Sequence, residues 1–146
     1  MKKELVDSLY QRYPAIFAEH ILLREEEDHW TICCRDGWFD LIDTLCEQLQ
    51  FWTDTRNAPQ FVATSVKEKF GALRFVAQSK SAEQMGAVKM AYAMSTRLCE
   101  ECGAPGRLVV DGGCWMTRCE PHIPEGSITP AEFNRPFELR QRRIKP

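Results

Sequence analysis

Apolar residues recur at helical spacing in three stretches of the chain. Over Lys2–Tyr13 they fall on one face of a short helix, which Pro14 would end. Over Trp38–Thr53 their spacing predicts a longer amphipathic helix. A third helix is expected over Ser81–Leu98, because Ser81 and Gln84 have the pattern of a capping box. The two longer segments are the main helices of the predicted fold.

The segments between these helices alternate between apolar and polar residues, which is typical of strands. Trp30–Cys34 precedes the long helix, and Phe61–Lys69 and Ala72–Ala77 follow it. Gly71 separates the last two segments and can form either the bend of a tight hairpin or a bulge in one long strand. The pattern predicts an α+β fold with a small antiparallel sheet.

The composition is that of a globular domain. The 146-residue chain is 44% hydrophobic and 10% aromatic, so it can bury a core. Its net charge of −2 gives no global cationic field that would attract nucleic acid or membranes. No apolar run approaches the roughly 20 residues that span a bilayer, and the cationic N-terminus lacks the apolar segment of a secretory leader. We therefore expect a cytoplasmic protein with no membrane partner.

Two pairs of metal-ligating residues lie in the C-terminal third. Cys99 and Cys102 form one pair and Cys119 and His122 the other, each with two residues between its members. The 16 residues between the pairs suffice for one β-hairpin, with its turn at Asp111-Gly-Gly. Zinc prefers thiolate and imidazole ligands, and four of them close its tetrahedral shell. The spacing predicts a structural Zn²⁺ that stabilises a hairpin, similar to a zinc ribbon or treble clef.

A redox function competes with metal binding as an interpretation of the first cysteine pair. A redox Cys-x-x-Cys usually opens a helix that activates its thiolate, whereas Cys99 and Cys102 follow one. A chance cluster of buried thiols is also possible, but it leaves the repeated spacing unexplained. The odd count of seven cysteines also fits a reducing compartment, where thiols are more often ligands than disulfides. Cys114 lies five residues before Cys119, outside the ligand spacing, and is expected to be a packed thiol.

The chain is expected to divide into three regions. An α+β domain spans residues 1–98, the zinc module spans residues 99–122 and packs on it, and a basic tail spans residues 123–146. The tail is predicted to be extended or loosely packed, with a helical turn after Thr129-Pro130. From Arg135 onward it carries five cations and one glutamate, so it has a local positive charge.

Several residues are candidates for contact with a partner. Trp38 and Trp115 are the tryptophans expected to be partly exposed and to act as contact anchors. Cations on the predicted strands and in the tail have the chemistry to bind phosphate or an acidic partner, and these are Lys67, Lys69, Arg74, Arg140, Arg142 and Arg143. For all these cations the alternative is a solvated surface without a binding role.

The sequence offers little support for catalysis. Apart from His122 it contains only His20 and His29, and neither lies near a nucleophile pattern. No phosphate-binding glycine loop and no nucleophile elbow is present. Nucleases built on knuckles and a hairpin need further ligands for a second metal, and the 16 residues between the pairs contain no histidine or asparagine. We expect a protein that is not an enzyme.

Four segments together carry a resemblance to a known group of proteins. They are Gly37–Cys46 (GWFDLIDTLC), Val66–Phe75 (VKEKFGALRF), Cys99–Gly106 (CEECGAPG) and Gly112–His122 (GGCWMTRCEPH). In this order the chain resembles a group of small proteins encoded by phages and prophages, over roughly residues 10–122. That group usually has Gly-Gly-Trp where this chain has Gly113-Cys114-Trp115, and the tail is longer than its pattern requires.

The resemblance implies a function in binding. Small phage proteins of this type bind a host or phage macromolecule, and some inhibit host defence. It supports Cys99, Cys102, Cys119 and His122 as zinc ligands and implies no catalytic residue. The expected function is a non-enzymatic accessory protein that binds a host protein, with a defence component as the target. The alternative is an accessory protein that binds nucleic acid through the basic tail and the strand cations Lys67, Lys69 and Arg74.

Overall fold

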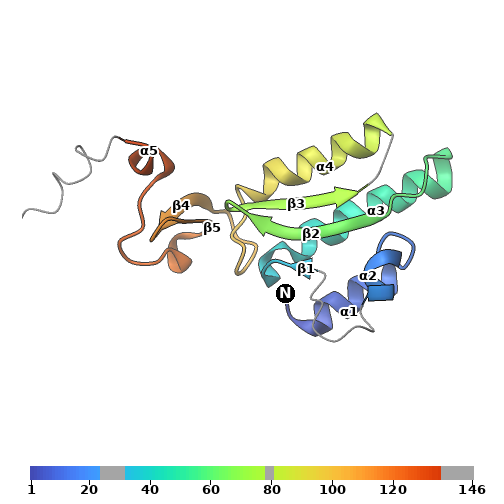
Figure 1. The fold of residues 1–146 in the computed structure, drawn as a ribbon, viewed down its shortest axis with the longest axis horizontal. Helices are drawn as coiled ribbons and strands as arrows, with labels where there is room; N and C mark the ends of the chain where they lie inside the picture. Colours follow the sequence, from blue (N-terminus) through green and yellow to red (C-terminus); the bar gives the residue numbers. More distant parts are fainter. Residues whose placement is uncertain (24–31, 78–80, 136–146) are drawn as a thin grey trace, which may run out of the picture.

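The computed structural model describes residues 1–23, 32–77 and 81–135 (Figure 1). The elements are, in chain order, α1 (Lys3–Arg12), α2 (Ala18–Leu23), β1 (Ile32–Cys33), the 3₁₀ turn η1 (Asp36–Trp38), α3 (Phe39–Arg56), β2 (Ala63–Lys69), β3 (Ala72–Ala77), α4 (Ala82–Ser95), β4 (Arg107–Asp111), β5 (Cys114–Arg118), the 3₁₀ turn η2 (Glu120–His122) and α5 (Pro130–Phe133). The predicted α+β class and both main helices are confirmed.

The strands β1, β2 and β3 form one sheet in that order. The turn between β2 and β3 has positive φ at Phe70 (55°) and Gly71 (72°), so it is a tight two-residue hairpin and not a bulge. In contrast, β1 runs parallel to β2, with Ile32 opposite Val66. The sheet is therefore mixed and not purely antiparallel as predicted. The reason is that α3 carries the chain back between β1 and β2, as a parallel crossover requires.

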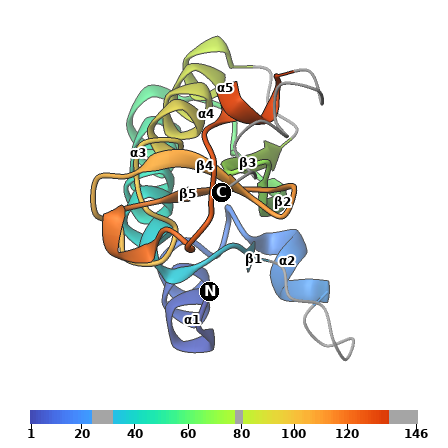
Figure 2. The ribbon, with the colours of Figure 1, turned by 90° about the vertical axis from the view of Figure 1, so that its left-hand side faces the viewer.

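The core lies where α1 and α3 face this sheet. In the end-on view α3 and α4 lie side by side along the sheet (Figure 2). Leu9 of α1 and Leu49 of α3 are completely buried there. The ring of Phe75 packs against those of Phe61 and Phe17, with ring centroids 5.9 and 6.3 Å apart. The helices and the sheet therefore enclose a single continuous apolar core.

The ends of the two main helices have clear local causes. α3 continues past the predicted Thr53 to Arg56 and ends at Asn57, which adopts the left-handed conformation (φ 53°) common at helix C-termini. α4 begins as predicted, because the Ser81 hydroxyl accepts a hydrogen bond from the Gln84 N–H at 3.3 Å. It ends at Ser95, before the predicted Leu98, which leaves three residues to lead into Cys99.

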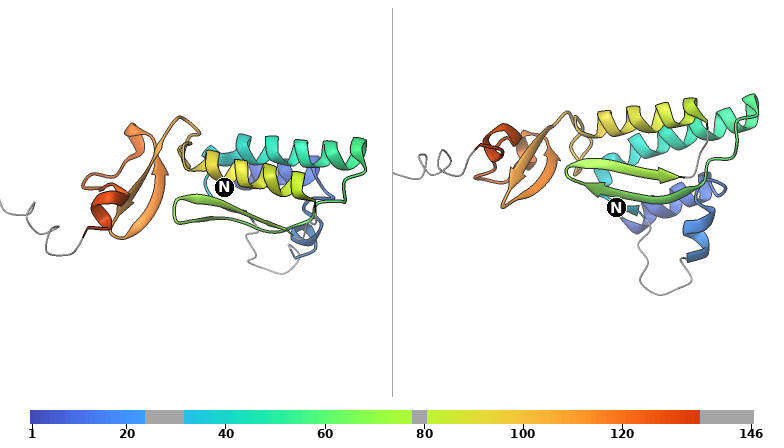
Figure 3. Two further views of the ribbon diagram at one scale, coloured as in Figure 1. Left: turned by 90° about the horizontal axis from the view of Figure 1, so that it is seen from above. Right: turned by 45° about the horizontal axis from the view of Figure 1, so that its top comes forward.

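The strands β4 and β5 form a separate antiparallel hairpin beyond the β2–β3 turn (Figures 1 and 3). Its turn contains Gly112 and Gly113, both with positive φ, at the position the sequence predicts. The hairpin contacts the first sheet through Thr117, whose hydroxyl donates to the carbonyl of Gly71 at 2.7 Å. This contact fixes the hairpin against the tip of the larger sheet.

Residues 123–135 pack on this hairpin, although the whole segment 123–146 is predicted to be an extended or loosely packed tail. Ile128 pairs with Val110 of β4 through two backbone hydrogen bonds of 2.8 and 2.9 Å. The predicted helical turn is present as α5, which Thr129 and Glu132 cap reciprocally. Within the described residues, the module therefore extends past His122.

Candidate metal centre

The structure brings the four predicted ligands together. Cys99, Cys102, Cys119 and His122 each offer one ligand atom, and these atoms all lie within 4.8 Å of one another. Cys99 follows α4, Cys119 follows β5, and His122 ends η2. A helix, a hairpin and a 3₁₀ turn therefore converge on one point, and the spacing of the two pairs predicts this correctly.

Each pair closes a tight turn that points both side chains to the same side. In the first, the Gly103 N–H donates to the Cys99 carbonyl at 2.8 Å, and Gly103 has the positive φ (74°) that a side chain would resist. In the second, the His122 N–H donates to the Cys119 carbonyl at 2.9 Å. These backbone bonds orient the two side chains of each pair toward the same point.

The spacing of the ligand atoms fits a tetrahedral ion. The sulfurs of Cys102 and Cys119 lie 3.6 Å apart, and Nδ1 of His122 lies 3.1 Å from the Cys119 sulfur and 3.5 Å from that of Cys99. Two sulfurs bound to one tetrahedral ion at ~2.3 Å are about 3.8 Å apart. The histidine turns Nδ1 toward the sulfurs, so this nitrogen is the one placed to coordinate.

The close packing of the thiols shifts the pKa values of two of them in opposite directions. Burial would raise the pKa of Cys99, but the backbone N–H groups of Cys119, Cys102 and Glu101 lower it to about 6. Burial and the neighbouring thiols raise the pKa of Cys119 to about 11. Neighbouring sulfurs disfavour the thiolate of Cys119, and a positive charge nearby would favour it. A bound metal ion would supply that charge and hold all three as thiolates.

A buried ion pair lies next to the ligand cluster, and the sequence does not predict it. Glu100 and Glu101 lie between the first two ligands, and Arg118 directly precedes Cys119. The Arg118 guanidinium pairs with Glu100 at 3.0 Å and with Glu101 at 3.2 Å, and the Arg118 and Glu100 side chains are only 7% and 6% exposed. Glu101 also pairs with Arg35 at 3.1 Å. The residues between the ligands therefore join the two turns to each other and to the α+β core.

Gly37 is a point of close backbone contact between the core and the metal site. Its N–H donates to the Glu100 carbonyl at 2.8 Å. A Cβ at this position would lie 2.3 Å from the Cys99 carbonyl oxygen and 2.5 Å from the Cys102 nitrogen, so the two backbone segments would have to move apart. A glycine is therefore required here by close backbone approach. The only sequence signal is that Gly37 begins one of the resemblance motifs.

The remaining cysteines lie outside the ligand cluster. Burial raises the pKa of Cys34 to about 12 and also raises that of Cys46, so both are inert core thiols. Cys114 is exposed at the start of β5 and is not the packed thiol that the sequence predicts. The reason is that it adjoins the two-glycine turn, where the hairpin has no neighbour to cover it.

The predicted contact residues have mixed outcomes. Trp38 is completely buried, which contradicts the expectation of partial exposure. Its indole N–H donates to the Leu98 carbonyl at 2.9 Å, so it holds the segment that enters the metal site. Trp115 is half-buried, with its ring edge-on to Phe133 at 5.8 Å.

The strand cations Lys67, Lys69 and Arg74 are exposed on β2 and β3. The tail cations Arg140, Arg142 and Arg143 lie outside the described residues.

Comparison of the chain with protein-family models, with curated proteins and with solved structures finds no match. None of the helices that the structure describes combines the length and the apolar character needed to cross a bilayer.

Proposed function

We propose that the Cys99, Cys102, Cys119 and His122 cluster binds Zn²⁺ as a structural ion, in a module similar to a zinc ribbon or treble clef. The donor set supports this, because three thiolates and one imidazole select zinc over harder cations. Four protein ligands fill a tetrahedral shell and leave no position for a substrate water. The ion would then stabilise the fold without taking part in a reaction.

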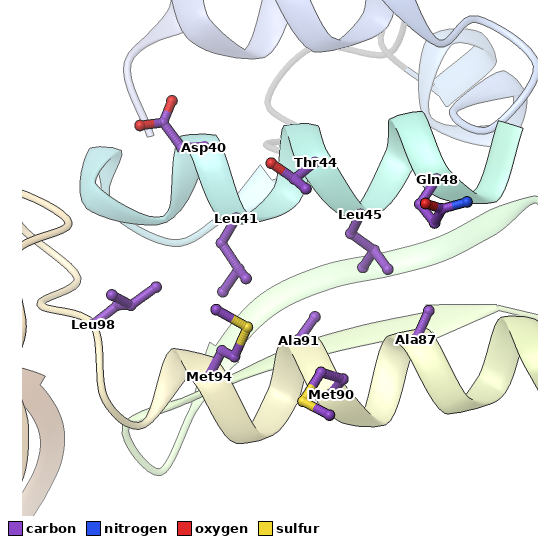
Figure 4. A pocket seen from close by; sticks show the side chains of 10 residues that line it. All are labelled: Asp40, Leu41, Thr44, Leu45, Gln48, Ala87, Met90, Ala91, Met94 and Leu98. Atoms are coloured by element: carbon purple, nitrogen blue, oxygen red, sulfur yellow. The ribbon is translucent and has the colours of Figure 1, made fainter. Parts of the chain in front are cut away.

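We further propose that the protein is a non-enzymatic accessory protein of phage or prophage origin. It acts in the cytoplasm of the bacterial host by binding a host protein, with a defence component as the target. The four sequence motifs support the origin. The observation that carries protein binding is an open apolar groove between α3 and α4, with a volume of about 390 Å³ (Figure 4).

The groove has the character of a helix-binding site. Leu41 and Leu45 line it from α3, and Ala91 and Met94 line it from α4. Met94 is 45% exposed and its neighbour Met90 62%, although both are apolar. Flexible methionine side chains suit a groove that accepts the apolar face of an amphipathic helix. Asp40, at the rim, forms no ion pair with a described residue, which favours a partner helix that carries a cation there.

The test is capture of host proteins with the zinc-loaded chain and two matched variants. Met94→Glu places a charge in the groove, whereas Ala93→Glu places the same charge on an exposed position of α4 outside it. We expect the unaltered chain and Ala93→Glu to capture the same host protein in equal amounts. Met94→Glu should capture at least tenfold less of it. Equal zinc content and melting temperature of both variants exclude a folding defect. Capture that Met94→Glu leaves unchanged, or no capture by the unaltered chain, would overturn the proposal.

A further inference from the structure

The cations on the outer face of the sheet and on the adjoining side of α4 differ from most of the other cations that the structure describes. Elsewhere, Arg12 pairs with Asp43 at 2.6 Å, Arg107 with Glu120 at 2.6 Å, and Arg118 with Glu100 at 3.0 Å. In contrast, Lys67, Lys69 and Arg74 of the sheet and Lys89 of the neighbouring helix α4 form no ion pair with any residue in the described portion of the chain. We call these four the strand-face cations. Their charge is available to a ligand.

The sheet places two of these charges directly against each other. Lys67 of β2 is paired in register with Arg74 of β3, and both are exposed. Their neighbours Val66 and Phe75 are buried in the core, so Lys67 and Arg74 point to the opposite, open face. Like charges opposite each other on a sheet destabilise it. An anion bound between them would relieve that repulsion.

The acidic residue of β2 does not neutralise this face. Glu68 alternates with Lys67 and Lys69 along the strand and therefore points the other way. Its carboxylate accepts a hydrogen bond from the Gly71 N–H at 2.6 Å and so stabilises the hairpin turn. Among the described residues of β2 and β3, the open face therefore carries three cations and no acid.

Exposed aromatic rings lie beside the strand-face cations. The Arg74 guanidinium lies 4.9 Å from the ring centre of Tyr92 on α4, and the Lys69 ammonium lies 5.4 Å from that of Phe70. Tyr92 is 40% exposed and Phe70 is 63% exposed. A shallow groove of about 320 Å³ between β3 and α4 is lined by Arg74, Lys89 and Tyr92. Phosphate-binding and ring-stacking groups are therefore interleaved on one surface.

We propose that this surface binds single-stranded nucleic acid, with phosphates on the strand-face cations and bases stacked on Tyr92 and Phe70. Single strands expose the faces of their bases, and sequence-tolerant binding proteins combine cationic grooves with aromatic platforms for this reason. A duplex hides its bases and would contact the cations alone. The inference goes beyond the proposed protein-binding groove, because Met94 and Ala91 line a different side of α4 from Lys89 and Tyr92.

The test is fluorescence anisotropy of the zinc-loaded full chain with a labelled 20-nucleotide oligothymidine, titrated from about 50 to 200 mM salt. The double variant Lys67→Gln/Arg74→Gln should weaken binding at least tenfold. It should also reduce the slope of log K against log salt by about 1.4, since each single-strand phosphate contact contributes about 0.7. Tyr92→Leu should weaken binding by about fivefold or more and leave the salt slope unchanged, because stacking releases no counterions.

Matched controls separate this surface from general charge effects. Lys3→Gln/Arg107→Gln removes two exposed cations elsewhere and should change affinity less than twofold. No binding at about 50 mM salt would overturn the proposal. So would an equal loss in the control variant, which would assign binding to overall charge or to the tail. Duplex DNA or polyglutamate bound as tightly as oligothymidine would overturn the assignment to single strands. None of these outcomes bears on the host-protein capture by the α3–α4 groove.

Discussion

The α+β core and the metal module bury very different side chains. The core cluster, which extends from Val6 to Ala91 in the sequence, consists of apolar residues such as Leu9, Ile42 and Phe61, and the buried polar side chains of α4, Gln84 and Ser95, are uncharged. The module buries Val109 and Val110, but it also buries the polar or charged Glu100, Thr117 and Arg118. Burial of apolar surface contributes about 25 cal/mol per Å² to the stability of such a core, which therefore needs no metal ion. The module lacks such a cluster and depends on directed bonds.

Directed bonds can therefore order a short segment next to a conventional domain. Structural zinc contributes roughly 10–16 kcal/mol in small modules, which exceeds what a hairpin gains from burial. The buried ion pair and the close contact at Gly37 then hold the ordered module against the core. We therefore expect that perturbations of the metal, of the ion pair and of the contact affect the module first, in that order of size.

Removal of the metal should give the largest effect. Cys102→Ser, or a strong chelator, should unfold residues 99–135 and leave the α3 helix and the β2–β3 hairpin folded. The physical reason is that the core retains its apolar cluster, whereas the module loses its main source of stability. Hydrogen exchange should show loss of protection in β4, β5 and at the Gly37 amide, which bonds to the Glu100 carbonyl. Elemental analysis should give one zinc per chain before and none after.

An unchanged melt in a sample that never contained zinc would contradict the assignment of a structural ion. Loss of protection throughout α3 would instead show that the core and the module unfold as one unit, and would remove the distinction between the two regions. Cys114→Ser is the matched control, because Cys114 is exposed and outside the ligand cluster. It should leave both zinc content and hydrogen exchange unchanged.

Breaking the buried ion pair should have the second largest effect. Arg118→Ala leaves the Glu100 carboxylate buried without its partner, which costs about 3–5 kcal/mol of unfolding free energy. Arg107→Ala removes an arginine whose ion pair with Glu120 is exposed, and should cost at most about 0.5 kcal/mol. Denaturant unfolding of the zinc-loaded proteins measures both. The double variant Glu100→Leu/Arg118→Met should recover most of the loss, because it removes both buried charges.

If Arg118→Ala and Arg107→Ala cost the same, the buried pair has no special role. In that case the metal alone would stabilise the module, and the buried ion pair would add nothing measurable to its stability.

Much of the fold and the metal site follows from local sequence patterns. Helical period predicts the bounds of the main helices to within a few residues, and the two-residue spacing of Cys99–Cys102 and Cys119–His122 identifies the four side chains that the structure brings together. These signals are local, because a helix face or a ligand pair forms within one or two turns of chain. Turn glycines such as Gly112 are equally informative, since positive φ selects for glycine.

Features that the sequence does not predict depend on contacts between distant segments. The pairing of Arg118 with Glu100, the burial of Trp38 and the parallel direction of β1 each join residues from separate elements. Trp38 follows an Asp-Gly pair, which is typical of an exposed turn, yet this turn is covered by the metal site. The strand-face cations are visible in the sequence, but their lack of ionic partners in the described structure is not.

Substitution of Gly37 should have the smallest effect of the three but tests the joint between the two regions most directly. Gly37→Ala places a methyl group 2.3 Å from the Cys99 carbonyl oxygen, so η1 and the first ligand turn must separate. We expect a loss of about 1–3 kcal/mol of unfolding free energy and a measurable weakening of zinc affinity in competition with a chelator.

Gly86→Ala is the matched control, because a Cβ there meets open space on an exposed face of α4 and should stabilise the helix by about 0.5–1 kcal/mol. A loss of both stability and zinc affinity in Gly37→Ala, with no loss of either in Gly86→Ala, would show that the core and the metal site constrain each other at Gly37. A Gly37→Ala protein with unchanged stability and zinc affinity would show that the two regions are merely adjacent.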